Sequence, residues 1–209
     1  MNKAYNQIIN EIYDTIKSEE NPGKTADYIP ELAKIDKNKF AVCLKTLDGQ
    51  QFCAGDYQES FSIQSISKVL ILSLVYRTVG EEIWKRVDVE PSGNPFNSLY
   101  QLEADKGIPR NPFINAGALV MCDILLDLSN NPKQYFLDFM VEISGLKNIN
   151  YSEDIAISEI KNAYRNTALT NFIKSLGNIN NNPNDVLDLY CYICSLKLTC
   201  KELCTTFSF

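Results

Sequence analysis

The sequence of 209 residues contains no histidine. A hydrolase with a Ser-His-Asp triad is therefore excluded, because that mechanism needs an imidazole to take the proton from the serine hydroxyl. If this protein uses a serine nucleophile, a lysine amine or a tyrosine phenol must move the proton instead. The candidate catalytic groups are therefore serines that lie close to a lysine or a tyrosine.

The sequence also lacks long apolar runs and an excess of positive charge. No apolar run reaches the ~18 residues that a membrane-spanning helix needs, and the N-terminus has no apolar segment typical of a secretion signal. The net charge of -6 disfavours binding to nucleic acid or to an anionic membrane. We predict a cytoplasmic protein whose ligand is a small molecule or another protein, with no membrane or nucleic-acid partner.

The cysteines are seven, an odd number, in a chain too large to need a disulfide framework, so we predict that they are reduced. They stand at positions 43, 53, 122, 191, 194, 200 and 204. The spacing of the last four resembles that of a zinc site. However, residues 186–194 are typical of a helix core, with no glycine or proline turn between the cysteines. We favour packing of these thiols in the core, and a metal site is the alternative.

The composition, 45% hydrophobic and 22% charged, is typical of a globular protein of one large or two small domains. Apolar residues spaced three and four apart predict an amphipathic helix over residues 5–16. Residues 39–46 and 51–54 lie on either side of an Asp-Gly turn and predict a β-hairpin. A long apolar helix then begins at Ser65 and ends at Gly80.

The second half of the chain is predicted to be helical, with helices at 116–128 and 132–143 and a last helix after a polar linker at 178–184. Loops at 90–97 and 107–112 are polar but keep apolar residues, which favours loops folded over a site; plain helix connectors are the alternative.

The C-terminal residues 198–209 are apolar and periodic and show no helix cap, so we predict that the last helix is cut off at the end of the chain. The two strands of one hairpin would form a marginal sheet that needs a further partner. Both features predict a chain that is truncated at its C-terminus.

Ser65 and Lys68 are three residues apart at the start of the apolar helix, and residues at this spacing share a helix face. The same Ser-x-x-Lys spacing occurs at Ser144 and Ser158, so the spacing alone is a weak signal. Only Ser65 follows a hairpin and opens a long apolar helix, where backbone N–H groups and the helix dipole stabilise an oxyanion. Burial would lower the pKa of Lys68 and let its neutral amine accept a proton. The alternative is a solvent-exposed helix start without a catalytic role.

Six segments carry a resemblance to a known family. They are DYIP at 27–30, FSIQSISK at 61–68, EPSGNPFNS at 90–98, NPFINAGA at 111–118, RN at 165–166 and LDLY at 187–190. Together they closely resemble the serine-dependent glutaminases, and the match spans almost the whole chain. The resemblance implies a mixed α/β fold of the β-lactamase and transpeptidase type with a large helical subdomain. Residues 1–84 would hold the N-terminal helix, the hairpin and the nucleophile helix, and residues 85–209 the helical subdomain, ending within a helix.

The resemblance further implies that the protein hydrolyses the side-chain amide of L-glutamine to L-glutamate and ammonia through a serine acyl-enzyme. Ser65 matches the nucleophile, Lys68 the group that accepts or shuttles its proton, and Tyr190 the tyrosine that completes the relay. The substrate-binding positions are matched by Tyr28, Ser65, Asn115, Glu159, Asn166 and Tyr190. No metal or organic cofactor is implied, and the expected assembly is a homotetramer.

The residue types suit a zwitterionic amino acid, because a carboxylate such as Glu159 binds an ammonium and amides such as Asn115 and Asn166 bind a carboxylate. Glu159 and Asn166 are seven residues apart, which is two helical turns, and would face the same way if that segment is helical. The alternative interpretation of Glu159 and Asn166 is that they belong to a solvated helix face. The alternative for Tyr28 and Tyr190 is that they are ordinary half-buried aromatic residues.

Members of the resembled family continue beyond the end of this chain, and the resemblance implies that the missing part carries another active-site tyrosine, an oxyanion-hole N–H and several strands. An inactive truncated fragment that binds an amino acid or joins full-length subunits is therefore the main alternative. A penicillin-recognising acyltransferase is weaker, because the chain has no Ser-Asp-Asn or Lys-Thr-Gly motif and no export signal.

Overall fold

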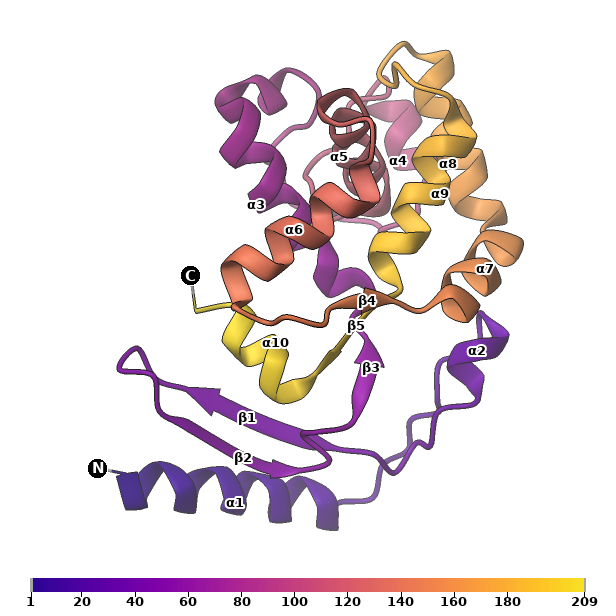
Figure 1. Cartoon of the computed structure of the whole chain (residues 1–209). Coiled ribbons are helices and arrows are strands. Elements are labelled where there is room, and N and C mark those ends of the chain that lie inside the picture. Colours follow the sequence, from indigo (N-terminus) through magenta and orange to yellow (C-terminus); the bar gives the residue numbers. More distant parts are fainter. Residues whose placement is uncertain (1, 209) are drawn as a thin grey trace.

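The computed structural model describes residues 2–208 of the chain. From top to bottom, Figure 1 shows a group of helices, a short three-stranded sheet, and a hairpin backed by one helix. The predicted mixed α/β fold of the β-lactamase type, with a large helical part, is confirmed. Among the described residues, no helix combines the length and the apolar character that crossing a membrane requires.

The N-terminal part consists of α1 (Asn2–Ser18), α2 (Pro30–Ala33), β1 (Ala41–Lys45) and β2 (Gln51–Gly55). The predicted first helix and the predicted hairpin are both confirmed. Helix α1 lies along the hairpin because its aromatic side chains pack on those of the strands. The ring of Tyr5 is 5.7 Å from that of Phe52, and the ring of Tyr13 stacks on Phe40 at the same distance.

A disulfide joins Cys43 and Cys53 across the hairpin, so the prediction that the cysteines are reduced is wrong for this pair. The two residues are direct partners in the antiparallel register, with their Cα atoms 4.2 Å apart. Opposed residues of a non-hydrogen-bonded antiparallel pair come about this close, so the register places the two sulfur atoms next to each other. The other five cysteines are free.

The nucleophile segment differs in detail from the prediction. A 3₁₀ turn, η1 (Gln64–Ile66), contains Ser65, and α3 (Ser67–Val79) begins only after it. Gly80 ends α3 with a positive φ of 60°, as predicted, and a second 3₁₀ segment, η2 (Gly80–Lys85), follows. Lys68 is therefore the second residue of the α-helix.

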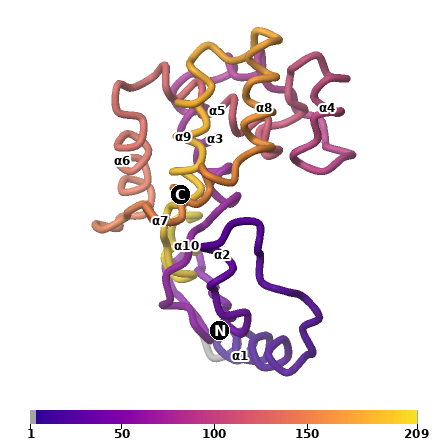
Figure 2. Tube along the Cα trace, turned by 90° about the vertical axis from the view of Figure 1, so that its right-hand side faces the viewer, coloured from indigo at the N-terminus to yellow at the C-terminus, as the bar shows by residue number. Residues whose placement is uncertain are grey.

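The remaining helices are α4 (Leu99–Ala104), α5 (Asn115–Leu128), α6 (Pro132–Ser144), α7 (Glu153–Asn162), α8 (Tyr164–Ser175) and α9 (Pro183–Cys194). Helix α5 is central, because every side of it between Ala116 and Leu125 is buried. It contacts α3, α6, α8 and α9. Figure 2 shows α6 and α4 on opposite sides of this group. The predicted helices at 116–128 and 132–143 are confirmed.

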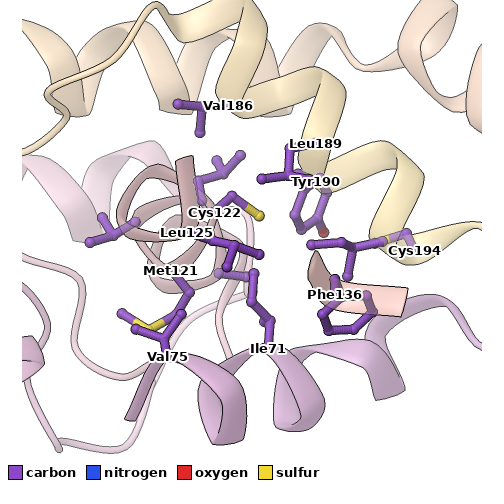
Figure 3. Close-up of a cluster of buried hydrophobic side chains, with 14 of the residues drawn as sticks. Ile71, Val75, Met121, Cys122, Leu125, Phe136, Val186, Leu189, Tyr190 and Cys194 are labelled. Atoms are coloured by element: carbon purple, nitrogen blue, oxygen red, sulfur yellow. The ribbon is translucent and has the colours of Figure 1, made fainter. Parts of the chain in front are cut away.

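The main apolar core lies where α3, α5, α6 and α9 meet (Figure 3). Ile71 and Val75 of α3 face Met121 and Leu125 of α5, with Phe136 of α6 beside them, and all five are at most 1% exposed. Burial of each such side chain stabilises the fold by about 1.5–3 kcal/mol. This core holds in place the ends of α3, α5 and α9 that carry the candidate site.

A second sheet contradicts the prediction of a single two-stranded hairpin. Its strands are β3 (Ser60–Ser62), β4 (Asn150–Tyr151) and β5 (Leu196–Thr199), in the order β3-β5-β4 and all antiparallel. The predicted final helix is therefore interrupted: α9 ends at Cys194, β5 follows, and a separate helix α10 (Cys200–Thr206) begins with a capping box. In that box Thr199 accepts from the Glu202 backbone N–H, and Glu202 accepts from the Thr199 N–H. Strand β5 leads the chain from the helices back to the hairpin.

The linker at 178–184 is tied to α5 by a buried carboxylate. Asp123 is fully buried and accepts hydrogen bonds from the backbone N–H groups of Asn180 and Asn181 and from the guanidinium of Arg86. Burial raises the pKa of Asp123, but these hydrogen bonds outweigh that effect and leave its pKa below the ordinary value. The linker is therefore an ordered part of the helical group.

The loop before α5 lies directly against the first turn of that helix. A Cβ at Gly117 would stand 2.0 Å from the backbone oxygen of Asn111, which no side chain tolerates. The Asn111 side chain in turn accepts from the backbone N–H groups of Phe113 and Ile114. Glycine is thus required here for the close approach that sets the position of Asn115.

Candidate active site

A cavity of about 480 Å³ opens between the N-terminal part and the helices. Its walls come from the segment before α2, from η1, from the loop before α4, and from the ends of α5, α7, α8 and α9. Six of the seven predicted site residues line it, namely Tyr28, Ser65, Asn115, Glu159, Asn166 and Tyr190. These residues span more than 160 positions of the sequence, so only the fold brings them together.

The seventh residue, Lys68, lies just behind this wall. It is 3% exposed, and its Nζ donates a hydrogen bond of 2.7 Å to Oδ1 of Asn115. The ammonium also stands 5.8 Å from the centre of the Phe96 ring, which belongs to one of the two loops predicted to fold over a site. Burial lowers the pKa of Lys68, against a smaller opposing effect of Cys194 and Glu159. A lysine with a lowered pKa is suited to accept the proton of a serine three residues away.

Asn115 connects Lys68 to the substrate-facing wall. Its Nδ2 donates to Oδ1 of Asn166 at 3.0 Å, while its Oδ1 accepts from Lys68. Because an ammonium only donates, these two bonds fix which end of the amide faces the lysine. The backbone N–H of Asn115 also donates to the carbonyl of Phe96 at 2.9 Å, which ties the covering loop to α5.

Glu159 presents an unsatisfied carboxylate to the cavity. The residue is 8% exposed, and among the described residues its Oε2 has no hydrogen-bond partner. Burial raises the pKa of Glu159, and the Lys68 ammonium opposes the rise. A buried carboxylate oxygen without a hydrogen-bond partner lowers the stability of the folded state. Its position in the cavity wall favours a cationic group of a ligand as the missing partner.

The two tyrosines occupy different depths. Tyr190 is 4% exposed, and burial raises its pKa well above the ordinary value, with a further contribution from Cys194. It is therefore a neutral phenol at physiological pH. Tyr28 stands at the mouth, 60% exposed, and its hydroxyl donates to Oε1 of Gln64 at 3.3 Å.

The backbone just before Ser65 is in an unusual conformation. Gln64 has a φ of 48°, in the left-handed region that non-glycine residues rarely adopt. Both polar atoms of its side-chain amide form hydrogen bonds, since Oε1 accepts from the Tyr28 hydroxyl and Nε2 donates to the Ser62 hydroxyl at 3.1 Å. Such strain is found at functional sites, where the surrounding contacts maintain it.

The segment that carries Glu159 and Asn166 is not one continuous helix, so the argument from helical spacing does not apply to this pair. Helix α7 ends at Asn162, Ala163 caps it, and α8 begins at Tyr164. Both side chains nevertheless face the same cavity, because the break turns the start of α8 toward it.

The family of the chain follows from comparison with known proteins. The glutaminase family model matches residues 23–209, which is most of the sequence. The chain belongs to the glutaminase family.

Individual glutaminases agree with this assignment. The chain is 52% identical over 203 residues to a glutaminase of Christiangramia forsetii and 48% identical over 205 residues to glutaminase 2 of Escherichia coli. It covers 67% of each of these relatives, which in turn match 97% and 98% of the chain.

Solved structures of the family have the same fold. A probable glutaminase, YbaS, superposes with a TM-score of 0.85 at 30% identity, over 93% of this chain and 63% of that one. The Mglu structure in its Tris and glutamate form superposes with a TM-score of 0.88 at 27% identity, over 97% of this chain and 45% of that one. The chain therefore spans about two thirds of the length of the curated glutaminases and less of the solved ones.

Four polar residues of this glutaminase cavity were missed by the sequence reasoning: Gln64, Asn97, Asn162 and Arg165. Three of them adjoin residues or motifs that were singled out, since Gln64 precedes Ser65, Asn97 belongs to the segment at 90–98, and Arg165 precedes Asn166. Neighbours of motif residues were thus the available signal. Asn162 gave none.

Proposed function

We propose that this protein hydrolyses the side-chain amide of L-glutamine to L-glutamate and ammonia, with Ser65 as the nucleophile. The observation that carries the proposal is that one cavity combines Ser65, a nearby lysine of lowered pKa and a buried carboxylate with an unpartnered oxygen. The first two supply an activated hydroxyl, and the third supplies a site for the α-ammonium of an amino acid. Membership of the glutaminase family supports the same substrate.

In the proposed first half-reaction, the neutral amine of Lys68 takes the hydroxyl proton of Ser65, and Oγ attacks the side-chain carbonyl carbon of glutamine. The carbonyl electrons move to oxygen and form a tetrahedral intermediate. When the intermediate collapses, the C–N bond breaks, and the proton held by Lys68 goes to the leaving nitrogen, which departs as ammonia. A water molecule then attacks the γ-glutamyl ester in the same way and releases glutamate and the free Ser65.

The roles of the other wall residues follow from their charge. Glu159 accepts hydrogen bonds from the α-ammonium of the substrate. The amides of Asn115 and Asn166 donate to the α-carboxylate of the substrate. Tyr190, a neutral phenol, contributes hydrogen bonding next to the reacting atoms, and Tyr28 closes the mouth through Gln64. A relative whose solved form is described as holding glutamate supports an amino acid as the ligand.

We further infer that the protein acts in the cytoplasm, in glutamate formation, and assembles as a homotetramer. The homotetramer and the role in glutamate formation rest on the family resemblance, and the compartment rests on the sequence pattern described above. Sedimentation equilibrium of the purified chain tests the assembly, and a species of four subunits is the expected result; a monomer at all concentrations would contradict it.

A second candidate function is amino-acid binding without turnover. The relatives are longer than this chain, so groups that act in their reaction could lie in the third of their length that the 209 residues do not match. This candidate keeps the roles of Glu159, Asn115 and Asn166 and removes that of Ser65.

Ammonia release from L-glutamine separates the two candidates. The matched control for Ser65→Ala is Ser158→Ala, because Ser158 has the same Ser-x-x-Lys spacing but does not line the cavity. Turnover by the wild type and by Ser158→Ala, with none by Ser65→Ala, is the expected result. Binding of glutamate without any turnover would favour the second candidate, and turnover by Ser65→Ala would reject the nucleophile.

A further inference from the structure

Arg165 is the one cationic side chain among the described residues that line the cavity, and the proposed reaction leaves it without a role. The one anionic side chain there is Glu159, whose Oε2 has no hydrogen-bond partner among these residues. Within residues 2–208 the two side chains form no ion pair with each other. Both charges are therefore free to act on a ligand.

Arg165 differs from the other arginines of the chain in lacking a carboxylate partner. Each of the other three forms an ion pair: Arg77 with Glu142, Arg86 with Asp123 and Arg110 with Asp105. The contact found for the Arg165 guanidinium in the described part of the chain is a long one, from Nη1 to the backbone oxygen of Asn97 at 3.5 Å. A guanidinium has five N–H donors in a planar fork that matches a carboxylate. Most of these donors remain for a ligand.

Glu159 and Arg165 occupy helix ends at which their charges are unfavourable for the fold. Glu159 is in the last turn of α7, and Arg165 is in the first turn of α8. The helix dipole favours cations at the C-terminal end of a helix and anions at the N-terminal end, so each residue carries the opposite of the favoured charge. Residues that oppose the stability of their own element are expected at functional sites.

The break between α7 and α8 therefore presents two ends of opposite charge to one cavity. The C-terminal end of α7, with the Glu159 carboxylate, attracts an ammonium. The N-terminal end of α8, with the Arg165 guanidinium, attracts a carboxylate. A free α-amino acid carries both groups on one carbon atom, whereas a glutamine residue inside a peptide carries neither.

We propose that Arg165 is a specificity-determining residue, whose guanidinium binds the α-carboxylate of the ligand beside Asn166 and so restricts the site to free amino acids. The identity of the ligand rests on the proposed function. The contact is tested by binding alone, without turnover, so the two can fail separately.

Calorimetric titration with two ligands tests the contact. L-glutamate and its α-amide have the same α-ammonium and the same side chain, but the α-amide has no negative charge where Arg165 would bind. We expect the preference of the wild type for L-glutamate over the α-amide to fall about tenfold in Arg165→Gln. The affinity for the α-amide should change less than about twofold. The effect is not larger because Arg165 is exposed and solvent screens its charge.

Lys161→Gln is the matched control, since it removes one positive charge from an exposed residue of α7 that does not line the cavity. It should keep the wild-type preference. Arg165→Lys keeps the charge without the planar fork and should retain part of the preference. The proposal is overturned if the wild type and Arg165→Gln show equal preferences, if Lys161→Gln loses as much as Arg165→Gln, or if Arg165→Gln loses both ligands equally.

A thermal melt of each variant shows whether it is folded. If Arg165→Gln does not fold, Arg165→Met, which also removes the charge and keeps a long side chain, takes its place. A wild type whose preference depends on Arg165 but that releases no ammonia from L-glutamine would mean that the contact exists and the proposed hydrolysis has failed. Hydrolysis of L-glutamine with a preference that does not depend on Arg165 would overturn the contact and leave the proposed function standing.

Discussion

Replacing Glu159 by glutamine should weaken ligand binding without weakening the fold. The substitution keeps the shape of the side chain and removes the negative charge of the carboxylate. Within residues 2–208, Oε2 of this carboxylate has no hydrogen-bond partner. A hydrogen bond to a charged group contributes about 1.5–3 kcal/mol, so we expect Glu159→Gln to bind L-glutamate about 10- to 150-fold less tightly. Calorimetric titration with L-glutamate, the product that is not consumed, measures this change.

The same variant should lose ligand affinity but not stability: its free energy of unfolding should equal or exceed that of the wild type. Because burial raises the pKa of Glu159, the folded state holds this proton more tightly than the unfolded state does. The free energy of unfolding therefore falls as the pH rises from the ordinary glutamate pKa through the raised one, and the penalty is fully present above that range. Glutamine carries no such penalty, so at neutral pH urea unfolding should show Glu159→Gln to be as stable as the wild type or more so.

Asp154→Asn is the matched control, since it removes one negative charge from an exposed position of the same helix. We expect it to bind L-glutamate like the wild type. The reasoning is refuted if Glu159→Gln binds within about twofold of Asp154→Asn, or if it is less stable than the wild type by more than ~1 kcal/mol, which would make the carboxylate a structural group.

Three further substitutions test other parts of the account. Lys68→Arg keeps the charge but cannot deprotonate near neutral pH, so glutamine turnover should fall at least 100-fold; a loss below tenfold would mean that Lys68 acts only as a charge. Asp123→Ala removes the ion-pair partner of Arg86 and leaves the backbone N–H groups of Asn180 and Asn181 without their acceptor, so it should lower the free energy of unfolding by about 3–5 kcal/mol at pH 7. Because the pKa of Asp123 is lowered in the folded state, its contribution is present above the ordinary pKa and is lost as the pH falls through the lowered one, so urea unfolding should show a much smaller difference in acid. Gly117→Ala forces a Cβ against the carbonyl of Asn111 and should destabilise by about 1–3 kcal/mol; a melt unchanged from wild type would contradict the close approach.

Elements with strong local signals were predicted correctly from the sequence. The helices at 5–16, 116–128 and 132–143 show a regular apolar period or a long apolar run, and the hairpin has a turn signal between two apolar strands. The site residues were identified because several of them belong to contiguous motifs. Their meeting in one cavity followed from the family resemblance rather than from any local pattern.

The second sheet could not be predicted, for a physical reason. Its strands are two to four residues long, and Ser60 pairs with Thr199, which is far away in the sequence. Periodicity over so few residues carries no signal, and only the packed helices bring β3 and β5 together. The apolar residues of β5 therefore resembled a continuation of the last helix.

Whether Cys43 and Cys53 face each other depends on the register of the hairpin, and a shift of one residue would separate them. A two-residue turn at Asp48-Gly49 would place Cys43 opposite Ala54. The loop between the strands instead spans 46–50, which shifts the pairing by one position and sets Cys43 opposite Cys53. Register in a hairpin is set by loop length, so the pairing of the two cysteines could not be recognised until the loop was known.

The nucleophilic role of Ser65 is the central claim, and covalent labelling tests it most directly. A diazoketone analogue of L-glutamine binds as the substrate does and is attacked by an activated nucleophile, which leaves a stable adduct as nitrogen gas departs. Peptide mapping by mass spectrometry should find the adduct on Ser65 in the wild type, no adduct at that peptide in Ser65→Ala, and protection of the wild type by excess L-glutamate. An adduct on a cysteine or on another serine, or labelling of Ser65→Ala at the wild-type rate, would contradict the account.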